Sequence, residues 1–180
     1  MISLGHFGFM SKIDKRIIGK NIKKLREATG LSQLDLSILI DISKRTLANL
    51  EAGRTSGNLD LLNKIIDFFN FSLHDLSKEE IEITVDFRDI LITHHKRNVA
   101  YINLLNKKPN IVYAIKYKLL PDGFLEIPRE IHEIRDHFKE FGWNYLGTSI
   151  SNALKRMPER VLISKHESKR NTNVYLTKKM

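Results

Sequence analysis

The 180-residue sequence predicts a mainly α-helical protein, with an all-α N-terminal module and a C-terminal α+β module. Three observations support this fold class. Apolar residues recur at helical spacing, separated by capping residues, over residues 15–77. Two alternating apolar segments flank a polar turn near the C-terminus, as in a β-hairpin. Net charge is +2 over residues 1–80 and +7 over residues 81–180. A function that uses only the first half would leave this difference in charge unexplained.

Composition narrows the class of protein. The chain contains no Cys, which excludes disulfides, Cys-based zinc sites and Cys nucleophiles. No run approaches the roughly eighteen consecutive apolar residues of a membrane span, so no membrane partner is expected. The formal charge of +9 indicates a polyanionic partner, and eight basic against two acidic residues fall within residues 155–180.

Residues 1–14 are predicted to be an N-terminal extension. The opening MISLGHFGFM is mildly apolar but has no basic n-region, and charged residues begin at Lys12, so a secretory signal is not expected. Met10 is an alternative translation start to Met1.

Five short helices are predicted over residues 15–77. The first carries Ile18, Ile22 and Leu25 at i, i+4 and i+7 and ends at Gly30, which suits a left-handed cap. The other four begin at the capping residues Ser32, Ser43, Asn58 or Asp60, and Ser72. Their expected inward side chains are Leu36, Leu39, Ile40, Leu47, Leu50, Leu59, Leu62, Ile65, Ile66, Phe69, Leu73 and Leu76. A single aliphatic core is therefore expected.

The segment 31–54 contains two of these helices, Gln33–Ile40 and Lys44–Ala52, joined by a turn at Asp41 and Ile42. This run resembles the phage-repressor (Cro-type, XRE-like) helix-turn-helix family over residues 15–77. The matching positions are Ile18, Gly19, Ile22, Leu25, Arg26, Leu31, Ser32, Gln33, Leu36, Thr46, Leu47, Leu50, Glu51 and Gly53. The resemblance implies a five-helix lambda-repressor-like DNA-binding domain. The sequence departs from the family at Asp41, where Gly is usual because the backbone is left-handed; Asp tolerates that conformation better than most residues.

The resemblance also implies site residues. In such domains the N-terminal residues of the second motif helix face base edges in the major groove. The implied base contacts are Ser43, Lys44, Arg45 and Asn49, and the implied phosphate contacts are Gln33, Thr46, Arg54 and Lys23. Lysine and arginine suit guanine, and asparagine suits adenine. Glu51 is implied to make an internal hydrogen bond. The alternative for the basic side chains is a solvated helix face.

Residues 78–110 are predicted to be an ordered connector whose apolar residues would suit self-association. Alternating apolar residues at Ile81, Ile83, Val85 and Phe87 favour a strand, and Ile90–Leu105 is compatible with a helix. The neighbouring residues His94 and His95 point apart on either element, so no metal site is expected.

Residues 111–180 are predicted to form a second module. The expected elements are a helix at Ile111–Leu120, a turn at 121–123, an extended piece at Phe124–Ile127, a helix opened by Pro128, a helix at Ser149–Met157 and a hairpin that turns at 166–173. This order resembles a winged helix by pattern alone. The second-module DNA candidates are Asn152, Lys155, Arg156, Lys169, Arg170 and Asn171. The alternative is that this module binds a protein or dimerises.

The sequence therefore predicts a sequence-specific transcriptional regulator that binds double-stranded DNA as a homodimer, in the cytoplasm at the nucleoid. No nucleotide-binding loop, catalytic set or metal-ligand spacing stands out, so neither an enzyme nor a cofactor is expected. Two alternatives stay open: an antitoxin or adaptor whose C-terminal half binds a protein partner, and a replication initiator of a mobile element.

Overall fold

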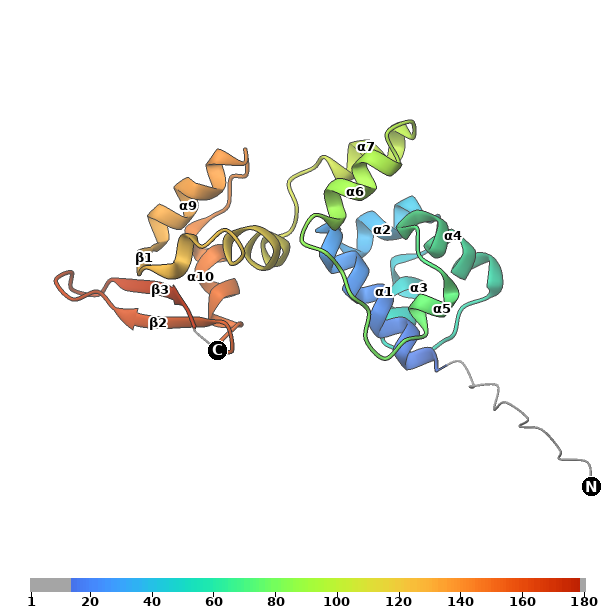
Figure 1. Cartoon of the computed structure of the whole chain (residues 1–180), viewed down its shortest axis with the longest axis horizontal. Helices are drawn as coiled ribbons and strands as arrows, with labels where there is room; N and C mark the ends of the chain where they lie inside the picture. Colours follow the sequence, from blue (N-terminus) through green and yellow to red (C-terminus); the bar gives the residue numbers. More distant parts are fainter. Residues whose placement is uncertain (1–13, 179–180) are drawn as a thin grey trace, which may run out of the picture.

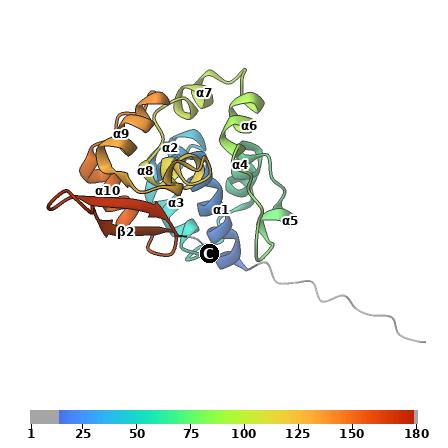
Figure 2. The same cartoon turned by 60° about the vertical axis from the view of Figure 1, so that its left-hand side comes forward.

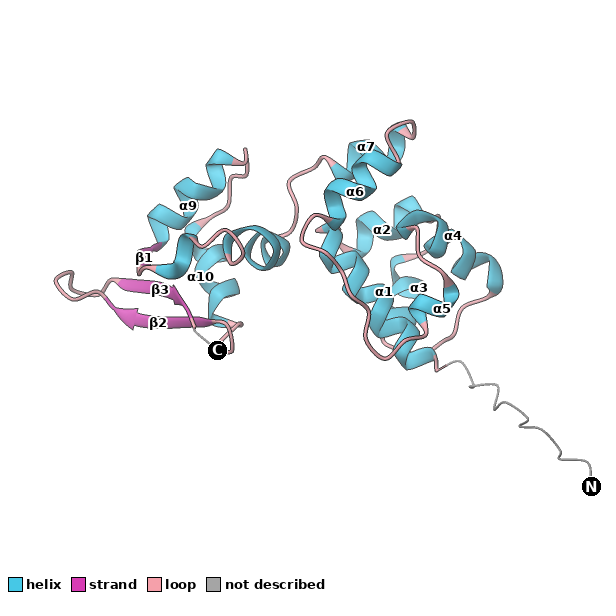
Figure 3. Cartoon of the chain, in the orientation of Figure 1, coloured by secondary structure: helices cyan, strands magenta, loops and turns pink. Residues whose placement is uncertain are grey.

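The computed structural model describes residues 14–178, which form two lobes along the long axis of the molecule (Figure 1). Helices α1 to α7 make the N-terminal lobe, and α8 to α10 with a three-stranded sheet make the C-terminal lobe. Figure 3 shows that helix dominates and that the strands lie in the C-terminal lobe. Residues 1–13, which hold most of the predicted N-terminal extension and the alternative start at Met10, lie outside the described residues.

The first five helices confirm the prediction because each carries its own start signal. They are α1 (Lys15–Thr29), α2 (Gln33–Leu39), α3 (Lys44–Glu51), α4 (Leu59–Phe69) and α5 (Leu73–Leu76). The side chains that cap them, each accepting a hydrogen bond from a first-turn amide, belong to Asp14, Ser32, Ser43, Asn58 and Ser72. Gly30 ends α1 in the left-handed conformation. Leu59 was wrongly expected to point inward, since it opens α4 and is 66% exposed.

The connector does not form the predicted strand. Residues 81–85 run as coil, and α6 (Phe87–His94) and α7 (Val99–Leu105) then replace the single predicted helix. The period-two pattern was misleading because Ile81 and Phe87 are buried in the N-terminal core, while Val85 between them is exposed. The sheet of the described residues contains no strand from this segment.

Connector residues instead complete the N-terminal core. Ile81, Phe87, Leu91 and Leu105 are buried in the same cluster as the apolar residues of α1 to α5. Much of the connector's apolar surface, which had suggested self-association, is thus buried within one chain. The N-terminal hydrophobic core extends to Leu105, well past the predicted boundary at residue 77.

The C-terminal lobe wraps three helices against a small antiparallel sheet. Its elements are α8 (Ile111–Ala114), the π-helical turn η1 (Ile115–Leu119), the 3₁₀ turn η2 (Phe124–Glu126), β1 (Arg129–Glu130), α9 (Ile131–Glu140), α10 (Gly147–Lys155), β2 (Val161–Lys165) and β3 (Asn173–Thr177). The strand order is β1-β3-β2, with Tyr175 of β3 opposite both Arg129 and Ile163. Ile115, Phe138 and Leu154 are among the fully buried residues of its separate core.

Several predictions for this lobe need correction. Phe124–Glu126 form the turn η2, in which Leu125 is fully buried, and only Ile127 of the predicted extended piece has an extended backbone. Pro128 does not open a helix, since the next two residues pair with β3 and α9 begins only at Ile131. Helix α10 begins at Gly147, before the predicted Ser149. The predicted C-terminal hairpin is confirmed.

A buried arginine joins the connector to the end of α1. The guanidinium of Arg88 donates hydrogen bonds to the carbonyl oxygens of Thr29, Leu105 and Lys107, the last over 2.7 Å. Only 5% of Arg88 is exposed, and its guanidinium lies 5.3 Å from the ring centre of Tyr113. Three backbone acceptors thus solvate a buried charge that would otherwise be costly.

The junction between the lobes is closed around Gly30. The amide of Asn110 donates to the carbonyl oxygen of Gly30 over 3.0 Å, and the Tyr145 hydroxyl donates to that of Pro109 over 2.7 Å. A Cβ atom on Gly30 would lie only 2.5 Å from the Cβ of Pro109 and 3.0 Å from Cγ of Tyr113. The two lobes therefore meet through close packing rather than through a loose linker.

We expect the Tyr113→Phe substitution to leave the free energy of unfolding at pH 7 unchanged or to raise it by about 1 kcal/mol. Tyr113 is fully buried, and its hydroxyl has no hydrogen-bond partner among residues 14–178. Burial raises the pKa of Tyr113 to about 12 from its ordinary value of 10.0. The folded state disfavours ionisation, so stability should fall as pH rises from 10.0 to about 12, and the variant should lose less.

Urea unfolding at pH 7 and across this alkaline range measures both effects, with Tyr101→Phe, a half-buried tyrosine, as the matched control. A clear loss of stability at pH 7 would contradict the expectation.

Candidate nucleic-acid interface

A tight turn at Asp41 and Ile42 orients α3 relative to α2. Asp41 adopts the expected left-handed backbone with φ of 52°, and the amide of Ile42 donates to the carbonyl oxygen of Ser37 over 2.9 Å. Ser43 then begins α3. Its Oγ accepts from the amide of Thr46 over 3.0 Å and lies 2.8 Å from Oγ1 of Thr46. The Ser43 hydroxyl, a predicted base contact, is therefore engaged in capping the helix.

Helix α3 packs against α1 with almost no space at Gly19. A Cβ atom at this position would lie 2.2 Å from the carbonyl oxygen of Leu50 and 3.1 Å from that of Glu51. Leu47 and Leu50 are fully buried on the same side of α3. The inner face of α3 is thus fixed against the core, and its opposite face is left to solvent.

A buried ion pair connects the three helices of this region. Nε and Nη2 of Arg26 donate to the carboxylate of Glu51 over 2.6 and 3.0 Å, and Nη1 donates to the carbonyl oxygen of Leu31 over 3.0 Å. Nε2 of Gln33 donates to the same carboxylate over 2.9 Å. The expected structural role of Glu51 is confirmed. Gln33, predicted to contact phosphate, is half-buried and partly committed to this network.

The outer face of α3 presents most of the predicted contacts. Lys44, Arg45 and Thr46 are exposed in its first turn. Asn49, one turn further, is half-buried, and its Oδ1 accepts from Nη1 of Arg54 over 3.2 Å. The structure thus brings the predicted base contact Asn49 and the predicted phosphate contact Arg54 together. Lys23 is exposed on α1, outside this helix.

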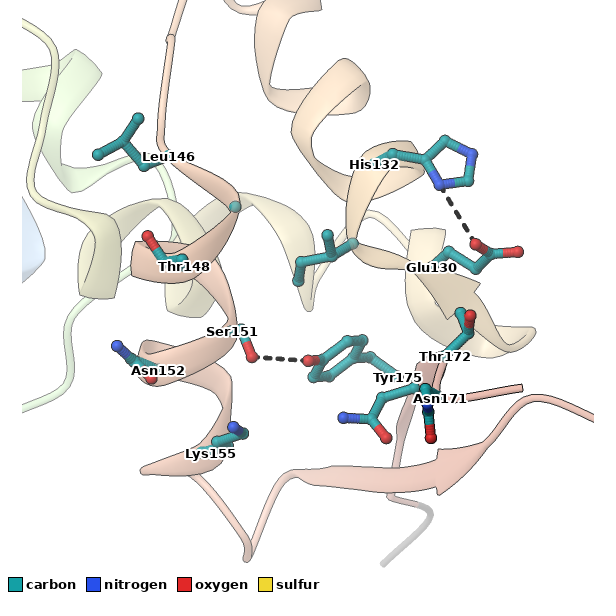
Figure 4. Close-up of a pocket in the computed structure, with 13 residues that line it drawn as sticks. Glu130, His132, Leu146, Thr148, Ser151, Asn152, Lys155, Asn171, Thr172 and Tyr175 are labelled. Atoms are coloured by element: carbon teal, nitrogen blue, oxygen red, sulfur yellow. Dashed lines mark hydrogen bonds and ion pairs between the residues drawn. The ribbon is translucent and has the colours of Figure 1, made fainter. Parts of the chain in front are cut away.

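A second polar surface lies in the C-terminal lobe, where a groove separates α10 from β3 and the hairpin turn (Figure 4). Its lining includes Thr148, Ser151, Asn152, Lys155, Asn171 and Tyr175. The Ser151 Oγ lies 2.8 Å from the Tyr175 hydroxyl and holds α10 to β3. Arg156 and Arg170 are exposed and are sequence neighbours of the lining residues Lys155 and Asn171. Of the sequence-predicted candidates of this lobe, the structure brings Asn152, Lys155 and Asn171 together along the groove, although they come from different elements.

Lys169 has a different role from its neighbours. Its Nζ forms an ion pair with Glu130 next to the groove, and Nδ1 of His132 lies 3.4 Å from the other carboxylate oxygen. The hydrogen bond from Lys169 lowers the pKa of Glu130. Lys169 thus anchors the hairpin turn to β1. Arg170 and Asn171 follow it, and Asn171 is in the left-handed conformation with φ of 61°.

Three residues beside this groove were missed by sequence reasoning. Thr148 was excluded because the helix was expected to begin at Ser149, and Glu130 was placed inside a helix. Tyr175 has no separate signal in the sequence, because alternation along a strand puts neighbouring residues on opposite faces, whereas Val174 and Tyr175 are both buried. The spacing of Thr148 and Asn152 at i and i+4 is the signal that would have revealed the first.

The two surfaces share a chemistry of hydrogen-bond donors and positive charge. Lysine, arginine and asparagine side chains project from exposed helix faces, which suits phosphate oxygens and base acceptors. Within residues 14–178, no group of three or more His, Asp or Glu is arranged to hold a metal ion. Over the same range, no helix is long and apolar enough to cross a membrane.

Comparison with known protein families gives a match within the N-terminal lobe. Residues 22–76 match the family model described as Helix-turn-helix, which runs from within α1 to the end of α5. The N-terminal lobe contains a helix-turn-helix domain. The predicted resemblance is confirmed, and this domain is of a DNA-binding class.

A curated relative matches part of the chain. The chain is 38% identical over 64 residues to Antitoxin PezA of Streptococcus pneumoniae serotype 4. The alignment covers 36% of this chain and 40% of the relative, so the chain spans about two fifths of the length of the protein it matches. No solved structure matches the chain.

Proposed function

We propose that this protein is a sequence-specific transcriptional regulator that inserts α3 of its helix-turn-helix domain into the major groove of double-stranded DNA. The observation that carries the proposal is the exposed first turn of α3, with Lys44 and Arg45 directed away from a core that Gly19 and Glu51 hold rigidly. A fixed helix loses little conformational freedom when it binds, so its side chains can discriminate between bases.

Each side chain of the interface takes a role from its chemistry. Lys44 and Arg45 donate to guanine O6 and N7, and Asn49 pairs with adenine. Arg54, which donates to Asn49, orients that amide and reaches the neighbouring phosphate. Thr46 is a further phosphate contact. Ser43 contributes mainly by capping α3, and Gln33 and Lys23 are the outermost phosphate contacts.

We expect Arg45→Ala to cost about 1–3 kcal/mol of binding free energy at the selected site and to relax the base preference there. Arg54→Ala should weaken binding to selected and random DNA more evenly, because it removes a phosphate contact. In vitro site selection with the full chain gives the DNA, and fluorescence anisotropy gives the affinities.

The matched control for Arg45→Ala is Arg135→Ala, which removes one exposed positive charge from α9 and should leave base preference unchanged. Equal losses on selected and random DNA for Arg45→Ala would contradict the role of α3 in reading bases.

We further propose that the C-terminal lobe is a winged helix. The element order α8, β1, α9, α10, β2, β3 and the sheet order β1-β3-β2 support this assignment. In that fold the helix before the hairpin is the groove-reading helix, here α10, and the hairpin is the wing. Asn152, Lys155, Arg156, Arg170 and Asn171 are then its DNA-facing residues.

The regulator is proposed to act as a homodimer at chromosomal DNA in the cytoplasm. Two-fold symmetric operators place half-sites about one helical turn apart, which suits a dimer of helix-turn-helix domains. Sedimentation of the full chain with and without the selected DNA tests this: one chain per duplex at all concentrations would reject the dimer.

The name of the curated relative is compatible with a second candidate, in which the C-terminal half binds a protein partner as an antitoxin or adaptor. The match spans only 64 residues, 36% of this chain, so the relative lends little support to a role for the whole chain. Co-purification of a protein of fixed stoichiometry with the full chain, lost when residues of α10 are changed, would favour this candidate over the second DNA-binding surface.

A further inference from the structure

The two polar surfaces are held in a fixed relation to each other. Asn110 and Gly30 are joined by a backbone hydrogen bond, Tyr145 bonds to Pro109, and Arg88 binds the carbonyl oxygen of Lys107. All of these contacts lie on the short segment between α7 and α8. Because this segment is packed on both sides, the helices α3 and α10 cannot reorient independently without breaking buried hydrogen bonds.

Both helices lie on the same side of the molecule. Helix α1 packs on α3 and on α8, and α8 packs on α10, so α1 and α8 form a common support. In Figure 1, α3 and α10 lie behind that support. In Figure 2, where the molecule is turned by 60°, α3 is seen to the left of α1 and α10 to the left of α8. The exposed residues of each helix are on the face opposite its support.

Basic residues also occupy the segment that joins the two surfaces. Lys107 and Lys108 are exposed and follow α7 directly. Lys108 Nζ donates to the carbonyl oxygen of Asn144, just before α10, while Lys107 is held near the end of α1 through Arg88. The one carboxylate that lines the α10 groove, that of Glu130, is paired with Lys169. The segment that joins the two lobes therefore carries two exposed positive charges.

We propose that one molecule uses α3 and α10 together on a single continuous DNA duplex, so that each chain recognises a bipartite site. This rests on the proposed function of α3 and adds a second, rigidly placed contact by α10 and the hairpin turn. The segment read by α10 flanks the helix-turn-helix half-site on the same face of the duplex. The footprint of one chain is consequently longer than that of a helix-turn-helix domain alone.

The test uses the full chain and two duplexes derived from DNA selected from a random pool. One duplex carries a single half-site with its flanking sequence, and the other carries the half-site alone. The variant is Lys155→Ala with Arg156→Ala, and the matched control is Lys96→Ala with Arg97→Ala, two adjacent exposed basic residues on the loop between α6 and α7. Both changes are on the surface, and thermal melting checks that the fold is retained.

On the long duplex, the Lys155/Arg156 variant should bind about ten-fold more weakly, with a salt slope smaller by about two, since two phosphate contacts are lost. Hydroxyl-radical protection of the flank should disappear while the half-site stays protected. On the short duplex, the variant and the wild type should bind equally. The control should match the wild type on both duplexes.

Equal affinity of variant and wild type for the long duplex would overturn the proposal, as would equal losses on the two duplexes or a footprint confined to the half-site. Each of these results leaves the function of α3 intact if Arg45→Ala still relaxes base preference. If Arg45→Ala has no effect on either duplex, the proposed function of the helix-turn-helix domain fails as well.

Discussion

Glu51→Ala should lower the free energy of unfolding of the N-terminal lobe by about 3–5 kcal/mol. The carboxylate of Glu51 accepts two hydrogen bonds from Arg26 and one from Gln33, and both ion-pair side chains are buried. Its removal leaves the guanidinium of Arg26 charged and without its counter-ion in a site that water barely reaches. Urea unfolding followed by circular dichroism measures the loss.

Two variants test whether the loss of stability comes from the unpaired charge of Arg26. Glu79→Ala removes an exposed carboxylate and should change stability by less than about 0.5 kcal/mol. The double variant Arg26→Leu with Glu51→Leu removes both charges and should recover much of the stability, because no unpaired charge remains. A loss below about 1 kcal/mol for Glu51→Ala would mean that the pair contributes little, as surface pairs do.

Gly19→Ala should destabilise the same lobe by about 3 kcal/mol or more, although it adds a single methyl group. The added Cβ would lie only 2.2 Å from the carbonyl oxygen of Leu50. This oxygen belongs to the backbone of α3, so it cannot move without moving the helix. Helices α1 and α3 must separate, which uncovers Leu47 and Leu50. We also expect weaker binding to the selected DNA at temperatures where the variant is folded, because α3 is displaced.

Gly147→Ala is the matched control in the other lobe. Gly147 is the first residue of α10, and a Cβ there would lie 3.5 Å from the nearest atom, Cγ2 of Ile131, an ordinary contact. Alanine at a helical position should be neutral or mildly stabilising. If the two substitutions had similar effects on unfolding, the close approach at Gly19 would not be the cause.

The N-terminal helices were predictable because their signals are local. Ser32 with Asp35 and Ser72 with Asp75 form capping boxes within a few residues of sequence. Gly30 ends α1 because glycine readily adopts the left-handed conformation of the cap. The connector was not predictable in this way. The burial of Ile81 and Phe87 depends on helices folded elsewhere, and Arg88 takes its three acceptors from segments far apart in the chain.

The candidate site likewise has features that local sequence predicts and features that depend on tertiary contacts. That Lys44 and Arg45 lie exposed in the first turn of α3 could be predicted, because they directly follow the capping residue Ser43. The hydrogen bonds of Gln33 to Glu51 and of Arg54 to Asn49 depend on how neighbouring helices meet, which sequence spacing does not specify. In the C-terminal lobe, pairing of residues 129–130 with β3 delays the start of the expected helix to Ile131, so that Glu130 lies in a strand and not in the helix.

The extension of the N-terminal core to Leu105 has a consequence for exchanging DNA specificities between regulators. A chimera cut at residue 77 would strip Phe87, Leu91 and Leu105 from the core and leave apolar surface open on the transplanted half. A donor segment that ends within 106–109 keeps that core whole, but the recipient must then supply the partner for Gly30 that Asn110 provides here. The unit that can be swapped is thus set by burial, and it is larger than the segment that the family shares.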